Sequence, residues 1–184
     1  VFFMAGVSGP LIAGDIEELY SAGVQKVIIF GNCGVLDSKI EDCSIIIPTK
    51  GFRDEGTSYH YVSPSETIEI NPDYKEDFIK ILNEYNFDYT EGYTWTTDAF
   101  YRETKDKIKY FKDNGAVCVE MEGTVIASVC QRLNMKYFTF YYAGDNLDST
   151  VWDKRSIDGP TNIDKKKEVL LIALELAVVL NNYE

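Results

Sequence analysis

Positive charge is scarce in this sequence of 184 residues, and so is histidine. The chain carries 18 Lys and Arg against 30 Asp and Glu, a formal net charge of -12, and a single His. Such a surface repels phosphate backbones and anionic lipid headgroups, so we expect neither a nucleic-acid partner nor a membrane partner. Any phosphate-bearing ligand must be bound locally, by backbone amides or a few well-placed cations.

Cysteine pairs are also lacking. The four cysteines include no Cys-x-x-Cys pair and have no histidine at ligand spacing, so no metal site and no redox dithiol is predicted. Four cysteines are too few for a disulfide scaffold, and we therefore expect buried free thiols in a cytoplasmic protein. The residues concerned are Cys33, Cys43, Cys118 and Cys130.

No apolar run reaches the ~20 residues that a membrane span requires. The most apolar stretch lies near the C-terminus and is interrupted by Glu175. The chain opens at Val1 with the apolar run VFFMAG, which has neither the Met nor the basic segment that begins a signal peptide. This opening resembles the middle of a fold, so we expect a piece of the protein to precede it.

The length fits one domain, residues 1–184, and the content of 45% hydrophobic and 14% aromatic residues is typical of a packed protein. Strand-like runs alternate with helical periodicity, which predicts an α/β fold with a largely parallel sheet. Strands are expected at 1–4, 26–30, 44–48, 89–96, 116–119 and 136–142. Helices are expected at 10–22, 72–85, 104–112, 120–133 and 162–181, with polar loops at 50–65 and 143–160.

The segment GNCG, residues 31–34, follows a strand. Its glycines allow backbone amides to approach an anion or ligand closely, although a plain tight turn explains them equally well. Glu120 and Glu122 flank Met121 at a strand-to-helix junction, where strand alternation directs both acids to one side. Such a pair suits adjacent hydroxyls, as in ribose, but acids at a helix N-terminus also complement its dipole.

Asp145 follows an aromatic strand, where α/β sheets place their ligand crevice. A carboxylic acid there can protonate a leaving group, or it can close an Asx turn. His60 lies in a polar-aromatic loop and is the only imidazole of the chain, the side-chain type best suited to proton transfer near neutrality. Phe100 offers an aromatic platform for a flat base, although aromatics at a strand end are more often part of a core.

The order of these motifs is more specific than any one of them: GNCG, RDEGTSYHY, TTDAFY, VEMEG and then AGD. In this order they resemble the nucleoside phosphorylase superfamily, which includes purine nucleoside phosphorylase, uridine phosphorylase and methylthioadenosine/adenosylhomocysteine nucleosidases. The resemblance extends from Gly6 to the C-terminal helix. It implies a three-layer α/β/α fold around a mixed, largely parallel central sheet.

The resemblance also implies roles for individual residues. Asp145 is the catalytic acid that protonates the departing base. Glu122 binds the ribose hydroxyls, Met121 packs beneath the sugar, Glu120 lines the base side and Phe100 stacks on the base. The other implied substrate-binding residues are Thr97, Asn32, Gly34, His60 and Arg53.

Three departures from the family pattern stand out. Ile29 occupies the position of the phosphate-binding arginine, and Thr104 and Asp106 replace the glutamine and arginine that read uracil. The N-terminal strand and glycine-rich phosphate loop of the family have no counterpart before Val1. The candidate replacement cations are Arg53, Arg102 and Arg155, each of which is by default a surface arginine.

The resemblance implies a nucleoside phosphorylase that converts a purine or related nucleoside and phosphate to free base and pentose 1-phosphate. It implies no metal and no organic cofactor, with phosphate as co-substrate. The alternatives are a hydrolytic nucleosidase and a catalytically silent binding or storage homologue. A homo-oligomer, a dimer or a trimer of dimers, is expected because family members share residues between neighbouring sites, with His60 and Arg53 near the shared edge.

Overall fold

Helices and strands alternate along residues 1–181, the part of the chain that the computed structural model describes. The strands are β1 (Lys26–Val35), β2 (Ile45–Asp54), β3 (Thr67–Glu69), β4 (Tyr89–Thr97), β5 (Ala116–Glu120) and β6 (Lys136–Asn146). The helices are α1 (Gly9–Ser21), α2 (Lys75–Glu84), α3 (Lys105–Asp113), α4 (Gly123–Leu133) and α5 (Ile163–Asn181). Two short 3₁₀ helices, η1 (Thr57–His60) and η2 (Phe100–Arg102), lie in the connections.

The sheet is mixed and has the strand order β3-β2-β4-β5-β1-β6. β1 runs parallel to β6, and β2, β4 and β5 run parallel to one another, whereas β1 meets β5 antiparallel. β6 also pairs antiparallel with the start of β2, through Ile45↔Tyr142 and Ile46↔Tyr141, so the sheet closes on itself. The predicted mixed, largely parallel sheet is confirmed.

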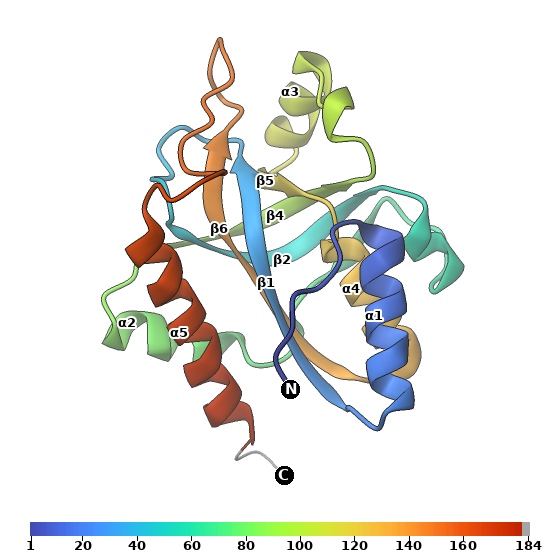
Figure 1. Ribbon diagram of the computed structural model, residues 1–184. Coiled ribbons are helices and arrows are strands. Elements are labelled where there is room, and N and C mark those ends of the chain that lie inside the picture. The colour runs from blue at the N-terminus through green and yellow to red at the C-terminus, as the bar shows by residue number, and fades with distance from the viewer. Residues whose placement is uncertain (182–184) are drawn as a thin grey trace.

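Helices cover the sheet on two sides, and Figure 1 shows α1 and α5 on opposite sides of β1. α1 and α4 bury their apolar faces together against β1 and β6, around residues such as Ile16, Ile126 and Val129. α2 and α5 pack on the other side around Phe78 and Phe138. The predicted arrangement of helices on both sides of a central sheet is therefore confirmed.

Local sequence explains where the first helix begins and ends. α1 has Pro10 in its first turn, where a proline costs no hydrogen bond, and it ends just before Gly23, whose φ is +93°. No helix among residues 1–181 is both long and apolar enough to cross a bilayer. All four cysteines are buried and free, as predicted.

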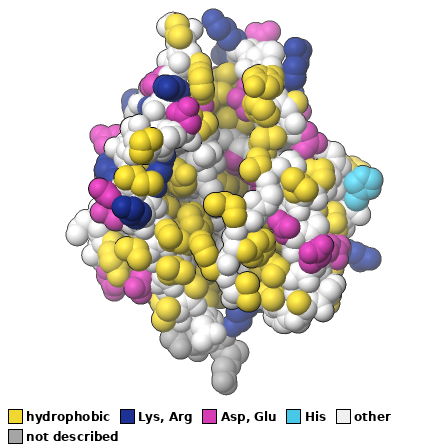
Figure 2. Space-filling view, in the orientation of Figure 1, with side chains coloured by type: hydrophobic (Ala, Val, Ile, Leu, Met, Phe, Trp, Pro, Cys, Tyr) yellow, Lys and Arg dark blue, Asp and Glu magenta, His cyan; other side chains and the backbone are white. Residues whose placement is uncertain are grey.

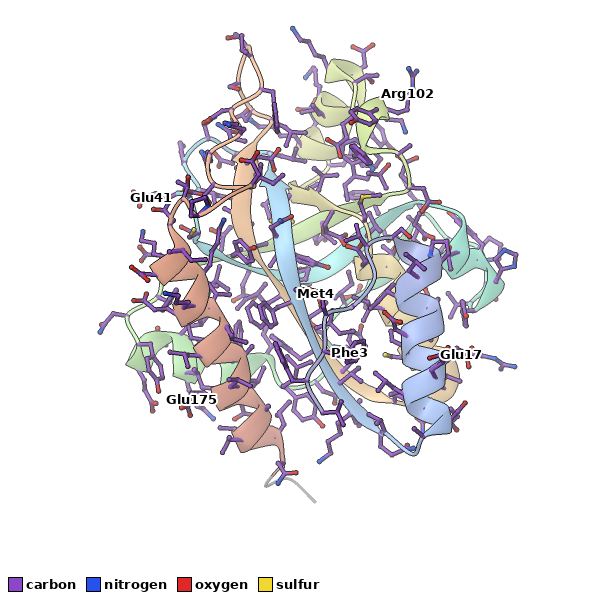
Figure 3. All side chains as sticks on the ribbon, viewed as in Figure 1. Phe3, Met4, Glu17, Glu41, Arg102 and Glu175 are labelled. Carbon is purple, nitrogen blue, oxygen red and sulfur yellow. The ribbon has the colours of Figure 1, made fainter. Side chains whose placement is uncertain are left out.

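One strand predicted from the sequence is absent, and the ends of three others are wrong. Residues 1–4 form no strand, because an apolar run becomes a strand only where it finds a pairing partner; Figure 3 shows Phe3 and Met4 on this extended segment. The GNCG segment is not a tight turn, since β1 continues through it to Val35 in register with β6. β2 likewise extends to Asp54 and β6 to Asn146, which shortens both predicted loops.

Candidate active site

The ends of four strands lie next to one another at one edge of the sheet. Thr96 on β4 pairs with Glu120 on β5, Val119 on β5 pairs with Gly34 on β1, and Gly34 pairs with Asp145 on β6. These positions are within one or two residues of the carboxyl ends of their strands. The carboxyl ends of strands are where open α/β sheets place their ligands.

Glu120 is only 5% exposed, and donors of the chain itself surround its carboxylate. Oε1 accepts hydrogen bonds from the hydroxyls of Thr94 (3.0 Å) and Thr96 (2.5 Å). Oε2 accepts from the backbone amides of Glu122 (2.7 Å) and Gly123 (2.5 Å), the first amides of α4. With four donors, both oxygens are fully used. Glu120 therefore caps α4 and joins it to β4 and β5, while its contact with a base stays a prediction.

The side chain of Glu122 points in a different direction from that of Glu120. The strand ends at Glu120, so alternation does not place the two acids on one side, and that prediction is wrong. Oε1 of Glu122 accepts the backbone N–H of Ser8 at 2.6 Å, which joins the start of α1 to the start of α4. Burial, with a smaller contribution from the charge of Glu120, raises the pKa of Glu122 to about 7. Near neutrality Glu122 can therefore accept or donate a hydrogen bond.

Asp145 is 6% exposed, and burial raises its pKa. A hydrogen bond from the indole of Trp152 and the charge of Arg155 act in the opposite direction. Gly34 lies beside it: a Cβ added there would lie 3.0 Å from Oδ1 of Asp145 and would collide with Leu147. Gly34 is thus required for close approach and not for an unusual backbone angle.

Glu103 is a residue of this region that the motifs did not indicate. It lies between η2 and α3, and burial raises its pKa to about 7, with a further contribution from the charge of Asp145. Two carboxyl groups whose pKa values are raised by burial thus lie near each other at this edge. In the sequence, the only signal that could have indicated Glu103 as a site residue is its position three residues after Phe100.

The TTDAFY segment lies at the end of β4. Thr97 is buried, and its hydroxyl accepts the backbone N–H of Ala99 at 3.2 Å. Phe100 is half exposed, with its ring centroid 4.2 Å from that of Tyr101. Asp98 accepts the backbone N–H of Gly56 at 2.8 Å, so this segment is joined to the RDEGTSYHY segment.

Comparison with known proteins agrees with this geometry. A family model described as the phosphorylase superfamily matches residues 2–178. The chain belongs to the phosphorylase superfamily.

Among curated members of the superfamily, a guanosine phosphorylase of Halorubrum lacusprofundi is 24% identical over 131 residues, which are 71% of this chain and 54% of the relative. A DeoD-type purine nucleoside phosphorylase of Bacillus cytotoxicus is 25% identical over 181 residues, covering 94% of this chain and 73% of the relative. The chain spans about half the length of two curated relatives that it matches, the guanosine phosphorylase among them.

Among solved structures, the AMP nucleosidase from Bacteroides thetaiotaomicron has a TM-score of 0.77 and 17% identity, covering 96% of this chain and 69% of that one. At that identity the similarity establishes the shared fold alone.

Arg53 is buried near the end of β2, and its side chain contacts the loop that follows. Its Nε donates to the hydroxyl of Ser58 at 2.8 Å, and Nη1 donates to the carbonyl of Ser63 and the hydroxyl of Ser65 at 2.8 and 2.9 Å. The guanidinium also lies over the ring of Tyr59. Nη2 is buried and has no hydrogen-bond partner within residues 1–181. Three of its donor contacts are therefore internal to the chain, and a phosphate contact stays a prediction.

The structure also shows where the other candidate cations lie, and where Ile29 lies in place of the expected arginine. Arg102 is exposed at the corner before α3 (Figure 3), and Arg155 donates to the carbonyl of Ile40 at 2.7 Å. Ile29 packs against the core shared by α1 and α4. At the position where the resemblance implies a phosphate-binding arginine, the side chain is thus apolar and contributes to the core.

The remaining predicted residues lie around this edge at different depths. His60 is exposed at the end of η1, and Figure 2 shows it at the rim of the molecule. Asn32 is exposed on β1 beside Gly144. Met121 is partly buried between Glu120 and Glu122.

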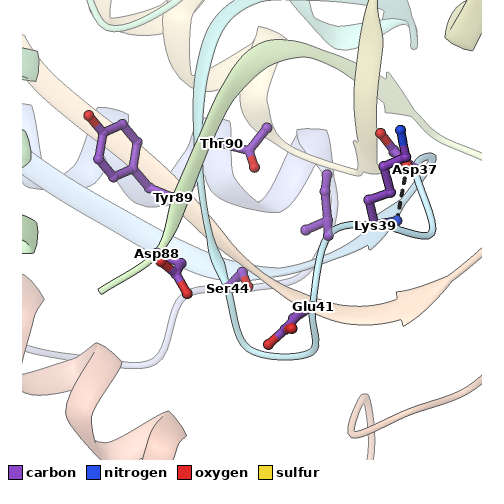
Figure 4. A pocket seen from close by; sticks show the side chains of 8 residues that line it. Asp37, Lys39, Glu41, Ser44, Asp88, Tyr89 and Thr90 are labelled. Atoms are coloured by element: carbon purple, nitrogen blue, oxygen red, sulfur yellow. Dashed lines mark hydrogen bonds between the residues drawn. The ribbon is translucent and has the colours of Figure 1, made fainter. Parts of the chain in front are cut away.

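Two shallow cavities lie outside this cluster. One, of about 310 Å³, is lined by residues such as Asp37, Ser44 and Tyr89 and lies at the opposite end of β4 from Thr97 (Figure 4). The other, of about 490 Å³, lies between α3 and the loop after β6, beside the ion pair of Lys112 and Asp148. Neither is lined by a predicted site residue in the described part of the chain.

Proposed function

We propose that this protein cleaves the N-glycosidic bond of a purine or related nucleoside, with phosphate accepting the pentosyl group. The observation that carries the proposal is the placement of a buried acid, Asp145, at the end of β6, which only β1 separates from the end of β5, where Glu120 leads to Glu122 at the start of α4. The superfamily relatives named as guanosine and purine nucleoside phosphorylases support the substrate class.

Cleavage of the bond requires one group that protonates the base and another that holds the sugar. As the bond from the sugar to the base breaks, negative charge collects on the base and positive charge on the sugar. In the proposed step Asp145, whose pKa burial raises, gives its proton to the base. Glu122 accepts hydrogen bonds from the sugar hydroxyls, with Met121 beneath the sugar and Phe100 and Thr97 on the base side.

The phosphate site is proposed beside the GNCG segment, at the carboxyl end of β1. Asn32 and Gly34 are the candidate residues there, and Arg53 on β2 is the candidate cation, through its unpaired Nη2. His60 and Arg53 are the candidates for an edge that a neighbouring copy completes, and the homo-oligomer stays a prediction.

Water is the second candidate nucleophile, and one observation favours it. Ile29 packs against the helices, so phosphate would lack its usual cation in a protein of net charge -12. An uncompensated phosphate is strongly disfavoured in a partly buried acidic site.

One assay tests bond cleavage and separates the two nucleophiles. We expect a panel of purine and pyrimidine nucleosides, incubated with and without phosphate, to release a purine base only with phosphate and to yield pentose 1-phosphate. Chromatography identifies the base and the sugar product. Release at full rate without phosphate, with free pentose as product, would assign the protein as a nucleosidase. If no base is released under either condition, bond cleavage is wrong and a binding role is supported.

Glu122→Gln should weaken a ribonucleoside more than its analogue lacking the contacted hydroxyl, because a charge-assisted hydrogen bond is lost only with the first. The expected loss for the ribonucleoside is roughly 10-fold in Kd. Since the pKa of Glu122 is about 7, its charged form and the preference for the hydroxyl should both grow as pH rises through neutrality. Calorimetric titration of both sugars measures this.

The matched control is Glu18→Gln, an exposed acid on α1, which should leave both affinities unchanged. Equal losses for the two sugars in Glu122→Gln would assign Glu122 to the Ser8 contact alone.

A further inference from the structure

The loop after β6 holds an exposed tryptophan against the buried acid. Asn146 and Asp153 form an isolated antiparallel bridge, with Asn146 N–H donating to the carbonyl of Asp153 at 2.8 Å. This bridge closes the loop and fixes the position of Trp152 next to it. Trp152 is 60% exposed, yet its Nε1 donates to Oδ2 of Asp145 at 2.6 Å. Burial does not explain this orientation, so the hydrogen bond is the contact that holds the indole.

The indole determines which oxygen of Asp145 can carry a proton. An indole N–H only donates, so Oδ2 must act as the acceptor. When Asp145 is protonated, its hydrogen is therefore favoured on Oδ1. That oxygen lies 3.0 Å from the position that a Cβ of residue 34 would occupy, so a side chain there would crowd it.

We propose that Trp152 is a positioning residue for the proposed reaction, because its indole orients Asp145 so that Oδ1 presents the proton to the leaving base. The inference rests on the proposed function. In the step, the O–H bond of Oδ1 breaks and an N–H bond forms on the base. The bond from the sugar to the base breaks with its electron pair going to the base, and the nucleophile bonds to the sugar carbon. The Asp145 carboxylate that results is stabilised by the indole N–H, and solvent returns its proton.

Other ionisable groups also act on Asp145 and set the background for this contact. They are Arg155 and Asp153 on its own loop, Glu103 from the segment before α3, and Cys33 from β1. The hydrogen bond from Trp152 is the largest influence that lowers the pKa of Asp145. Removing it should therefore raise that pKa while the other groups stay in place.

The experiment compares Trp152→Phe, which keeps a ring but loses the donor, with Val151→Ala, an exposed control in the same loop. On a purine nucleoside, Trp152→Phe should lower kcat by roughly 10-fold to 100-fold, as expected for a misoriented catalytic group. The alkaline limb of the pH–rate profile of Trp152→Phe should move to higher pH, because Asp145 then loses its proton at a higher pH. On an aryl riboside with an acidic phenol, which leaves without protonation, both variants should match the wild type. Equal losses on the two substrates, or an unmoved limb, would overturn the proposal.

A second measurement does not depend on activity. Carboxyl carbon NMR of the wild type and Trp152→Phe reports the pKa of Asp145 directly, and we expect a higher value in the variant. An unchanged pKa overturns the role of Trp152 even if the protein proves inactive on every nucleoside. A raised pKa in an inactive protein would instead reject the proposed function while the contact stands. Because Trp152 is exposed, the variant should remain folded, and the lost hydrogen bond should lower its thermal stability only slightly.

Discussion

Asp145→Asn is expected to lower kcat on a purine nucleoside by ~10²-fold or more, while KM changes little. Asparagine has nearly the same shape, and its carbonyl oxygen can still accept the indole N–H of Trp152. It has no acidic proton to give to the departing base. Steady-state kinetics over a range of pH measures the effect, and the alkaline limb of the wild type should be absent in the variant.

The pH argument follows from the direction of the shift. Burial raises the pKa of Asp145, so the acid form persists to higher pH than in a free aspartate. Activity should fall as pH rises through that raised pKa. The control is Asp158→Asn, whose carboxylate is exposed on the same loop and should be neutral to activity. Equal turnover in the wild type and Asp145→Asn would remove Asp145 from the reaction.

Glu120→Ala should destabilise the fold by about 3 kcal/mol or more, the usual cost of leaving buried donors without an acceptor. The substitution leaves two threonine hydroxyls and two amides of α4 without their partner. It also removes the connection between α4, β4 and β5. Urea denaturation followed by circular dichroism measures the free energy of unfolding.

Two further variants make this result specific. Glu120→Gln keeps two acceptor lone pairs and should recover part of the loss, because its amide can donate to the hydroxyls of Thr94 and Thr96. Glu18→Ala, on the exposed face of α1, should change stability by less than about 0.5 kcal/mol. A Glu120→Ala protein as stable as the wild type would show that the four hydrogen bonds contribute nothing net.

The helices were predictable because their signals are local. Pro10 and Gly23 delimit α1, and the periodicity of α5 reads directly from its sequence. Strand ends were less predictable, because they depend on partners that are distant in sequence. β1 continues past Gly31 only because β6 lies beside it, and residues 1–4 are apolar but have no ladder partner.

In the candidate site, too, local signals were predictable and contacts between distant residues were not. The motifs identified Asp145, Glu120 and Glu122 as candidates. They did not predict the direction in which each side chain points. Glu120 turns inward because two threonines of β4 and the first amides of α4 converge on it. Glu103 and Trp152 were missed because each is defined by its proximity to Asp145, which only the folded chain creates.

The long ladder between β1 and β6 has a consequence for the order in which the chain can assemble. β1 forms its long ladder only with β6, and contacts such as that between Cys33 and Tyr142 join residues 109 positions apart. During synthesis, β1 therefore emerges long before its partner and must wait until the whole of β6 has left the ribosome. Closing so large a loop is entropically costly before any contact compensates, so folding should be slow for a protein of this size. In that interval the apolar strand KVIIF has an unpaired edge, which makes the nascent chain dependent on protection from aggregation.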